Sequence, residues 1–258
     1  MGRVLATSDW HSCDFYNEIL NQLEPDDTLY FIGDAIDRGP AGIATFNALH
    51  NDKRVIMMKG NHEDLLAKYI ESDERMQGYV DGNGGNITIA SMAELTNEQK
   101  IKYAKLINKL PEKLIYHSPK GHVVILEHAG YSPFDIPYRS HDPLWDRTHF
   151  GDIWDAGGFN MEGLDPKNTY LVHGHTPVHY LKYVYGFKDK PALTISDLKE
   201  KEEFFGSDDK MTIKPEIIRY CGGHKFDIDM CIIITDRVAL LNLDTFEEIY
   251  FDRERLVK

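Results

Sequence analysis

Seven residues of types that bind divalent metal ions or carry protons follow short apolar runs of the sequence. They are Asp9, His11, Asp34, Asn61, His62, His128 and His175. Imidazole nitrogens, carboxylates and an amide oxygen suit ions such as manganese, iron or zinc. Ligands of α/β sheets bind outside the carboxyl ends of the strands. Side chains from these distant segments are therefore expected to meet in one metal centre.

The elements that must position these residues alternate between strands and helices. Early strands are predicted at 3–8, 28–32 and 54–58, and each is followed by apolar residues at helical spacing. This alternation predicts a βαβαβα start on a mainly parallel sheet and an α/β fold class. Later elements are predicted as a helix at 97–110, strands at 113–117, 122–127 and 169–172, a last hairpin of 226–235 and 237–243, and a strand near 248–251.

Two segments are expected to be irregular. Residues 81–86 (DGNGGN) indicate a Gly-rich loop, and the polar segment at about 186–220 indicates an insertion or lid. We find no linker between two separate cores. A single domain over 1–258 is therefore predicted.

Three glycines directly precede candidate ligands, and they are Gly33, Gly60 and Gly174. A glycine there permits a tight turn or a close approach of two backbones, because it has no Cβ. The plain alternative for any one of them is an ordinary turn. Their repeated position beside metal-binding residue types favours the first interpretation.

Five short motifs occur in a fixed order along the chain. They are SDWH at Ser8–His11, GDAIDRG at Gly33–Gly39, GNHE at Gly60–Glu63, HAG at His128–Gly130 and GHTP at Gly174–Pro177. This set resembles the phosphoprotein phosphatase family of metallophosphoesterases, and most of all its bacterial and phage members. The resemblance covers roughly residues 1–180 and, more weakly, 227–244. It implies two β-sheets packed face to face, with helices outside.

The resemblance also implies a ligand set for two divalent metal ions, most often manganese, with iron, zinc or nickel as alternatives. Asp9 and His11 would bind the first ion, and Asp34 would bridge both. The second ion would be held by Asn61, His128 and His175. A shared carboxylate holds two dications roughly 3.5–4 Å apart. A hydroxide between the metals would then attack phosphorus.

Four further residues receive roles from the resemblance. His62 would protonate the leaving oxygen, and Asp37 would hold its other ring nitrogen. Arg38 would hold phosphate oxygens, as would Arg147 after Leu144-Trp145-Asp146, although a surface salt bridge is the alternative for Arg147. Asn83-Gly84-Gly85 resembles a segment that borders the substrate cleft in bacterial members, with a simple turn as the alternative.

Three functions fit this set of residues. The first is hydrolysis of phosphomonoesters, on a phosphorylated protein or a small phosphate ester. The second is symmetrical hydrolysis of dinucleoside tetraphosphates, as by a bis(5'-nucleosyl)-tetraphosphatase. The third is a non-catalytic phosphate-binding module, which the presence of Asp34, Asp37 and His62 disfavours.

Composition excludes some partners. The formal net charge of −13 argues against general nucleic-acid binding, which depends on cations that neutralise phosphates. No apolar run reaches the roughly 18 residues that span a bilayer. The N-terminal sequence lacks the apolar stretch of a signal peptide, so a cytoplasmic location is expected. Oligomeric state is left open, as is a cleft role for His224.

Overall fold

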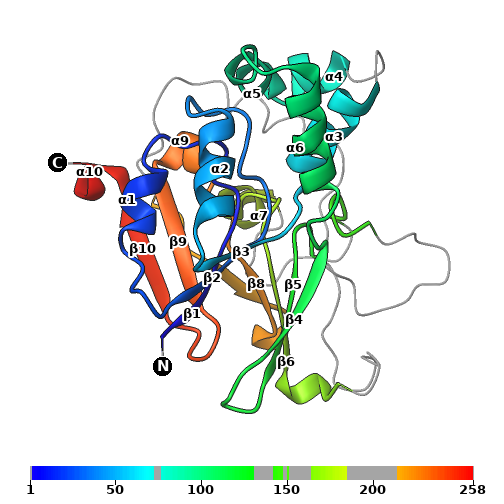
Figure 1. The fold of residues 1–258 in the computed structure, drawn as a ribbon. Coiled ribbons are helices and arrows are strands. Elements are labelled where there is room, and N and C mark those ends of the chain that lie inside the picture. The colour runs from blue at the N-terminus through cyan, green and yellow to red at the C-terminus, as the bar shows by residue number, and fades with distance from the viewer. Residues whose placement is uncertain are drawn as a thin grey trace.

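The computed structural model describes residues 2–72, 77–130, 142–147, 150, 164–184 and 214–257. Two five-stranded sheets pack together with helices outside them (Figure 1). The α/β fold of two sheets flanked by helices is thereby confirmed. Within the described residues, the helices are all too short or too polar to cross a membrane.

The first sheet has the order β10-β9-β1-β2-β3. Its parallel part consists of β1 (Val4–Thr7), β2 (Thr28–Phe31) and β3 (Val55–Met57). The antiparallel strands β9 (Arg237–Asn242) and β10 (Glu248–Asp252) complete it beside β1. The predicted βαβαβα start is confirmed, with helices α1 (Tyr16–Leu20), α2 (Ile43–Asn51) and α3 (Asn61–Ser72) after the three parallel strands.

The second sheet has the order β4-β5-β6-β8-β7. Strands β4 (Lys113–His117) and β5 (Val123–Glu127) form the predicted hairpin. Parallel pairing joins β5, β6 (Thr169–His173) and β8 (Lys225–Asp227), and β7 (Ile218–Tyr220) closes the edge antiparallel to β8. Parallel strands of both sheets thus end on loops that carry the candidate ligands.

The predicted last hairpin is wrong. Strand β8 ends at Asp227 in the second sheet, whereas β9 belongs to the first. Between them, the β-branched run that suggested a strand forms the one-turn helix α9 (Ile232–Thr235). Cys231 and Asp236 adopt left-handed backbone conformations at its two ends, which interrupts any extended strand there.

The predicted Gly-rich loop is also largely helical. Helices α4 (Gln77–Gly82) and α5 (Gly85–Ser91) take up most of it and leave only Asn83 and Gly84 between them. Gly84 has a φ of 77°, which glycine adopts without strain. The chain therefore turns within two residues instead of forming a long loop.

Most of the expected insertion lies outside the described residues, which resume at 214. Its last three residues, however, are regular, because they form β7. Three further helices are α6 (Asn97–Ile107), α7 (Val178–Val184) and α10 (Arg253–Leu256). Figure 1 shows α3, α4, α5 and α6 gathered together beyond the end of β3.

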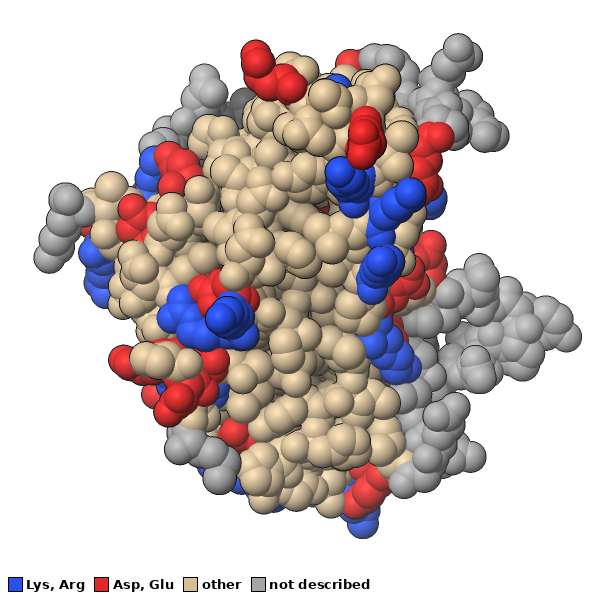
Figure 2. All heavy atoms as spheres, viewed as in Figure 1, with Lys and Arg blue, Asp and Glu red and all other residues tan. Residues whose placement is uncertain are grey.

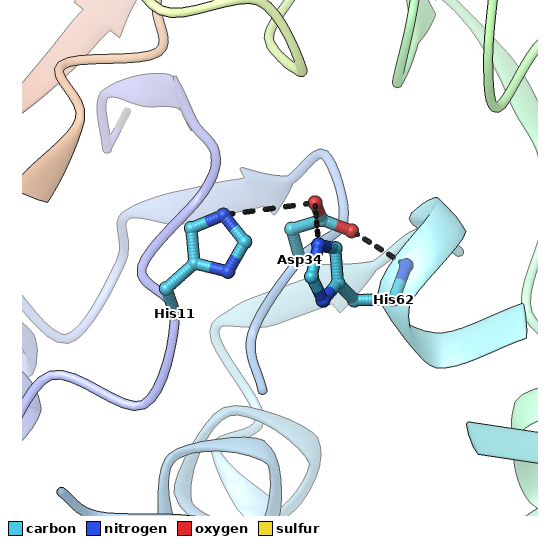
Figure 3. Close-up of side chains that lie close together, drawn as sticks. All are labelled: His11, Asp34 and His62. Atoms are coloured by element: carbon cyan, nitrogen blue, oxygen red, sulfur yellow. Dashed lines mark hydrogen bonds and ion pairs between the residues drawn. The ribbon is translucent and has the colours of Figure 1, made fainter. Parts of the chain in front are cut away.

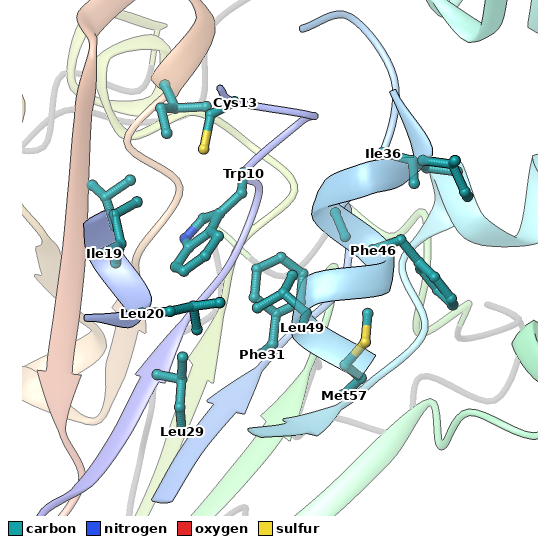
Figure 4. Close-up of a cluster of buried hydrophobic side chains, with 14 of the residues drawn as sticks. Trp10, Cys13, Ile19, Leu20, Leu29, Phe31, Ile36, Phe46, Leu49 and Met57 are labelled. Carbon is teal, nitrogen blue, oxygen red and sulfur yellow. The ribbon is translucent and has the colours of Figure 1, made fainter. Parts of the chain in front are cut away.

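Among the described residues, two large apolar cores stabilise the sheets. One lies between the sheets, where Ala6 and Ile32 meet Leu126, Val172 and Phe226. The other lies between the first sheet and its covering helices (Figure 4). Both cores reach the strand ends that bear the candidate ligands, so packing there fixes the loops.

Charged side chains on one face of the molecule are intermingled. Figure 2 shows basic and acidic groups next to each other around its margins, with a wide uncharged area between them. Ion pairs such as Arg54–Asp52 and Lys59–Glu112 have N–O distances of 2.6 and 3.0 Å. Mixed charges suit a solvated surface better than a nucleic-acid surface, and the absence of general nucleic-acid binding stays a prediction.

Trp10 links the core to the site, because it stands between Asp9 and His11 in the chain. Its ring is fully buried and packs edge-on against the ring of Phe31, with the two ring centroids 5.3 Å apart. We expect Trp10→Ala to lower the free energy of unfolding by about 3–5 kcal/mol, because it leaves a cavity. Urea unfolding measures this loss. Ile101→Ala, at a side chain 42% exposed, is the control and should change stability by less than about 0.5 kcal/mol. Equal effects of the two substitutions would contradict the packing described for Trp10.

Candidate metal centre

Asp34 is the meeting point of the predicted ligands. Its Oδ2 lies 3.8 Å from His11 Nε2, 3.8 Å from His62 Nε2 and 3.4 Å from His128 Nε2. Figure 3 shows the first two imidazoles directed at the same oxygen of this carboxylate. Two groups of potential ligands share it, namely His11, Asp34 and His62, and Asp34, His128 and His175. A common carboxylate between two groups is the arrangement that a two-metal site requires.

Asn61 and His175 complete the second group. The Asn61 Oδ1 atom lies 2.8 Å from His128 Nε2 and 2.9 Å from His175 Nδ1. Asn61 is the first residue of α3, and His175 follows β6. Three segments far apart in sequence thus bring their donor atoms to one point.

Asp9 lies at the other end of the site. Its Oδ1 is 3.9 Å from His11 Nε2, and its Oδ2 accepts a hydrogen bond of 3.0 Å from the backbone N–H of His175. Asp9 Oδ1 and His175 Nε2 are both buried, and neither has a hydrogen-bond partner among the described residues. Buried polar atoms are nearly always satisfied, so these two atoms indicate a missing partner.

The histidine tautomers point to the nature of that partner. His11 and His128 each place Nδ1 against a backbone carbonyl, at 3.1 Å from Ile36 and 2.8 Å from Ile32. With Nδ1 bonded in this way, Nε2 of His128 faces the oxygens of Asp34 and Asn61, and Nε2 of His11 faces Asp34 and the guanidinium of Arg38. Facing acceptors repel each other unless a proton or a cation lies between them. Metal-binding histidines characteristically show this carbonyl contact, so the residues fit divalent cations.

The pKa shifts of the buried site residues also favour a positive charge at this place. Burial raises the pKa of Asp9 to about 6. Burial also acts on Asp34, but the charges of His128 and His62 hold the pKa of Asp34 well below its usual range. Burial opposes a charge on His128, yet the charge of Asp34 prevails and raises the pKa of His128 to about 10. The centre therefore stabilises positive charge among its carboxylates.

His62 differs from the other histidines in its contacts. Its Nδ1 lies 2.7 Å from Asp37 Oδ2. The other oxygen of Asp37 accepts hydrogen bonds from Tyr79 Oη at 2.9 Å and Thr88 Oγ1 at 2.5 Å. Asp37 is fully buried, so its orientation is fixed, and it fixes the His62 ring in turn. By distance alone His62 belongs with the candidate ligands. Its contact with Asp37 distinguishes it from the other histidines of the site.

The two arginines that were predicted to bind phosphate lie beside different ligand groups. Arg38 is next to the group of His11 and His62, and Arg147 is next to the group of His175. Arg38 places Nη1 3.0 Å from His11 Nε2 and Nη2 2.9 Å from His62 Nε2. Its backbone N–H donates to Gly84 O at 3.2 Å, so the Asn83-Gly84-Gly85 segment supports this loop. Arg147 is exposed and donates from Nε to Thr176 Oγ1 at 3.1 Å, next to His175.

The loops of the site have an unusual backbone. Seven non-glycine residues there have positive φ, and they are Asp9, His11, Ser12, Asp34, Asp37, Arg38 and His175. Each such residue costs about 1–3 kcal/mol and persists only where its surroundings enforce it. Backbone hydrogen bonds do so here, since the N–H groups of Asp9 and His11 donate to the carbonyls of Gly33 and Asp34 at 3.0 Å. Such concentrated strain indicates a functional site.

Close contacts explain the glycines that precede the candidate ligands. A Cβ at Gly174 would lie 2.0 Å from Asp9 Oδ2, and a Cβ at Gly60 would lie 2.2 Å from Asp34 Oδ1. Neither position has room for a side chain. The predicted close approach of two backbones is confirmed at Gly60, whose Cβ would also lie 2.4 Å from Asp34 N, and at Gly33, whose Cβ would lie 2.5 Å from the Cα and N atoms of Gly60. At Gly174 the close contacts are with side chains.

Two buried acids of the site were not assigned a role from sequence. Glu63 accepts hydrogen bonds from the backbone N–H groups of Asp34, Ala35 and Gly60 at 2.7–2.9 Å. Its place in the GNHE motif is the signal that could have identified it. Asp229 is buried, and its backbone carbonyl accepts a 2.9 Å hydrogen bond from Val178, just beyond His175. Burial and the charge of Asp9 raise the pKa of Asp229 well above its usual range.

Two other histidines are placed outside the ligand groups. His173 is buried, with Nε2 2.6 Å from Tyr220 Oη and Nδ1 3.1 Å from Gly174 O. His224 places Nδ1 3.0 Å from the carbonyl of Thr169, at the start of β6. Because the ligand loops follow the opposite end of β6, the cleft role left open for His224 receives no support.

Family comparison agrees with this geometry. The chain matches the model of the calcineurin-like phosphoesterases over residues 2–225. It belongs to this family, and its activity class is therefore metal-dependent hydrolysis of phosphoesters. No curated protein matches the chain in sequence.

Two solved structures have a similar fold. One is described as a "putative diadenosine tetraphosphatase" and is 16% identical, with a TM-score of 0.52 over 97% of this chain and 93% of that chain. The other is a mutant of a cold-active protein tyrosine phosphatase, 15% identical, with a TM-score of 0.54 over 97% of this chain and 77% of that chain. At such identities the similarity concerns the fold alone.

Glu63 provides a test of how the Asp34 loop is held. We expect Glu63→Ala to lower the free energy of unfolding by at least about 3 kcal/mol, because three buried N–H groups lose their acceptor. Metal content should fall with it, and Glu63→Gln, which keeps one acceptor oxygen, should lose less. Urea unfolding and elemental analysis measure both effects. Glu94→Ala, at an exposed position, is the matched control, and a Glu63→Ala protein as stable as this control would contradict the assignment.

Proposed function

We propose that this chain hydrolyses phosphomonoesters with two divalent metal ions. The observation that carries the proposal is the buried Asp34 carboxylate shared by two groups of nitrogen and oxygen donors. Asp9, His11 and Asp34 would hold one ion. The other would be held by Asp34, Asn61, His128 and His175. Manganese is the favoured ion, and iron, zinc or nickel also suit these donors.

The ions, when bound, acidify water and neutralise phosphate charge. The chain's own residues do the rest. Arg38 turns its planar donors from the two imidazoles to the phosphate oxygens, and Arg147 supplies a second guanidinium from the His175 side. Both orient the ester so that the leaving oxygen faces His62.

His62 is the proposed proton donor to the leaving oxygen. Its Nδ1 is held by Asp37 at 2.7 Å, so Nε2 is the nitrogen that carries the transferred proton. A carboxylate on Nδ1 stabilises the charged imidazolium before transfer and fixes the ring. Tyr79 and Thr88 keep Asp37 in place through its other oxygen.

The motif order supports a Ser/Thr phosphoprotein phosphatase of the bacterial and phage type as the particular class. Symmetrical hydrolysis of dinucleoside tetraphosphates is the second candidate, and it would use the same donors. A non-catalytic module is the least supported, because His62 and Asp37 are paired and Asp34 is in place.

Turnover with added manganese tests the proposed function. The protein is first stripped with a chelator and then assayed with p-nitrophenyl phosphate, a phosphoserine peptide and diadenosine tetraphosphate. We expect manganese to restore hydrolysis of the phosphomonoesters. Absence of metal-dependent turnover of all three compounds would refute an enzymatic function, and turnover of the tetraphosphate alone would favour the second candidate.

His62→Ala tests the proton donor. We expect kcat to fall by about 10²–10⁴-fold, as for loss of a general acid, while elemental analysis finds the metals retained. The loss should be larger for an alkyl phosphate than for p-nitrophenyl phosphate, whose leaving group needs less protonation. A variant that loses its metals, or the same loss for both esters, would contradict this role.

A further inference from the structure

One aromatic side chain beside the metal centre is left partly exposed. Trp145 is 38% exposed. Its ring lies edge-on to the ring of His175, with the centroids 5.8 Å apart and the planes at 84°. The proposed hydrolysis uses no group of Trp145. An aromatic ring offers a large apolar contact surface, and the place of Trp145 beside the candidate metal centre puts that surface within reach of a substrate.

The segment that carries Trp145 is attached to both loops of the second ligand group. On one side, the backbone N–H of Ala129 donates to Pro143 O at 2.8 Å. On the other, Arg147 Nε donates to Thr176 Oγ1 at 3.1 Å. Trp145 therefore stands at a fixed place relative to the metal centre, with a guanidinium two residues away.

We propose that Trp145 is a specificity-determining residue that stacks on the base of a nucleotide substrate. An indole face and a neighbouring arginine together suit a ligand that carries both a planar group and phosphate. Stacking of a base on an aromatic side chain requires no particular base, because every base has a π-face. The inference rests on the proposed hydrolysis of phosphomonoesters, and it selects a nucleotide in place of the phosphorylated protein that the motif order supports.

The location of Trp145 selects a base over an aryl ring. In an aryl phosphate the ring is bonded directly to the leaving oxygen, which faces His62 in the proposed reaction. His62 lies in the group of His11, with ring centroids 4.7 Å apart, whereas Trp145 packs on His175 in the other group. A nucleotide base is separated from phosphorus by its ribose, so it can extend from one group to the other. The phosphoserine side chain offers no aromatic ring.

Equilibrium binding tests the proposal without turnover. Isothermal titration of the manganese-loaded protein compares methylenediphosphonate with adenosine 5'-methylenediphosphonate, which both resist hydrolysis and differ by the adenosine. The ratio of the two Kd values is the measurement, because a general loss of structure cancels in it. In the wild type we expect the adenosine compound to bind at least about fivefold more tightly.

Two variants and a control identify the source of that preference. Trp145→Ala should abolish the preference, and Trp145→Phe, which keeps a ring, should retain most of it. Ile115→Ala, at another exposed side chain, should leave it unchanged. A wild type without preference, or a preference that survives in Trp145→Ala, would overturn the proposal.

A second pair of compounds tests whether Trp145 recognises an aryl ring and not a nucleotide base. Phenylphosphonate is titrated against methylphosphonate with the same variants. If Trp145→Ala removes a preference for the phenyl compound and not for adenosine, the residue recognises an aryl ring and the nucleotide proposal is wrong. A failure of the proposed function would look different, since adenosine-dependent binding would then occur without metal-dependent hydrolysis of any ester.

Discussion

The crowding of three imidazole nitrogens around one oxygen of Asp34 is the constraint on which the structure depends. Three imidazole nitrogens lie within 3.8 Å of this oxygen. At His11 and His128 the carbonyl contacts of Nδ1 direct Nε2 inward. Positive charge between these atoms removes the repulsion, and the same charge is what phosphoester hydrolysis needs. Both the stability of the folded site and the proposed hydrolysis therefore require positive charge beside Asp34.

Holding the donors together requires support from the whole scaffold. The parallel strands of both sheets direct their loops to the same place, and two apolar cores fix the strand ends. Left-handed backbone at Asp9, Asp34 and His175 is maintained by hydrogen bonds between neighbouring loops. Glu63 contributes by binding three N–H groups with one carboxylate. Stability lost to strain in the loops is offset by packing and by these hydrogen bonds.

The sequence predicted the part of this arrangement that has local signals. Periodic apolar residues located the early strands, and residue types after them located the donors. The Ile-rich run at 232–234 misled because β-branched residues favour strands, whereas left-handed residues on either side enclose a single helical turn. Glu63 bonds to the backbone of Asp34 and Ala35, and Trp145 contacts His175, in each case across about 30 residues of sequence. The spacing of residues along the sequence does not predict such long-range contacts.

Metal stoichiometry tests the shared role of Asp34 most directly. The wild type and Asp34→Asn are loaded with manganese, dialysed, and analysed for metal per chain. The Asn side chain keeps the size of the carboxylate but removes its charge. If one carboxylate serves two ions, the wild type retains two ions per chain and Asp34→Asn loses occupancy at both positions. An Asp34→Asn protein that retains two ions with wild-type affinity would contradict the account.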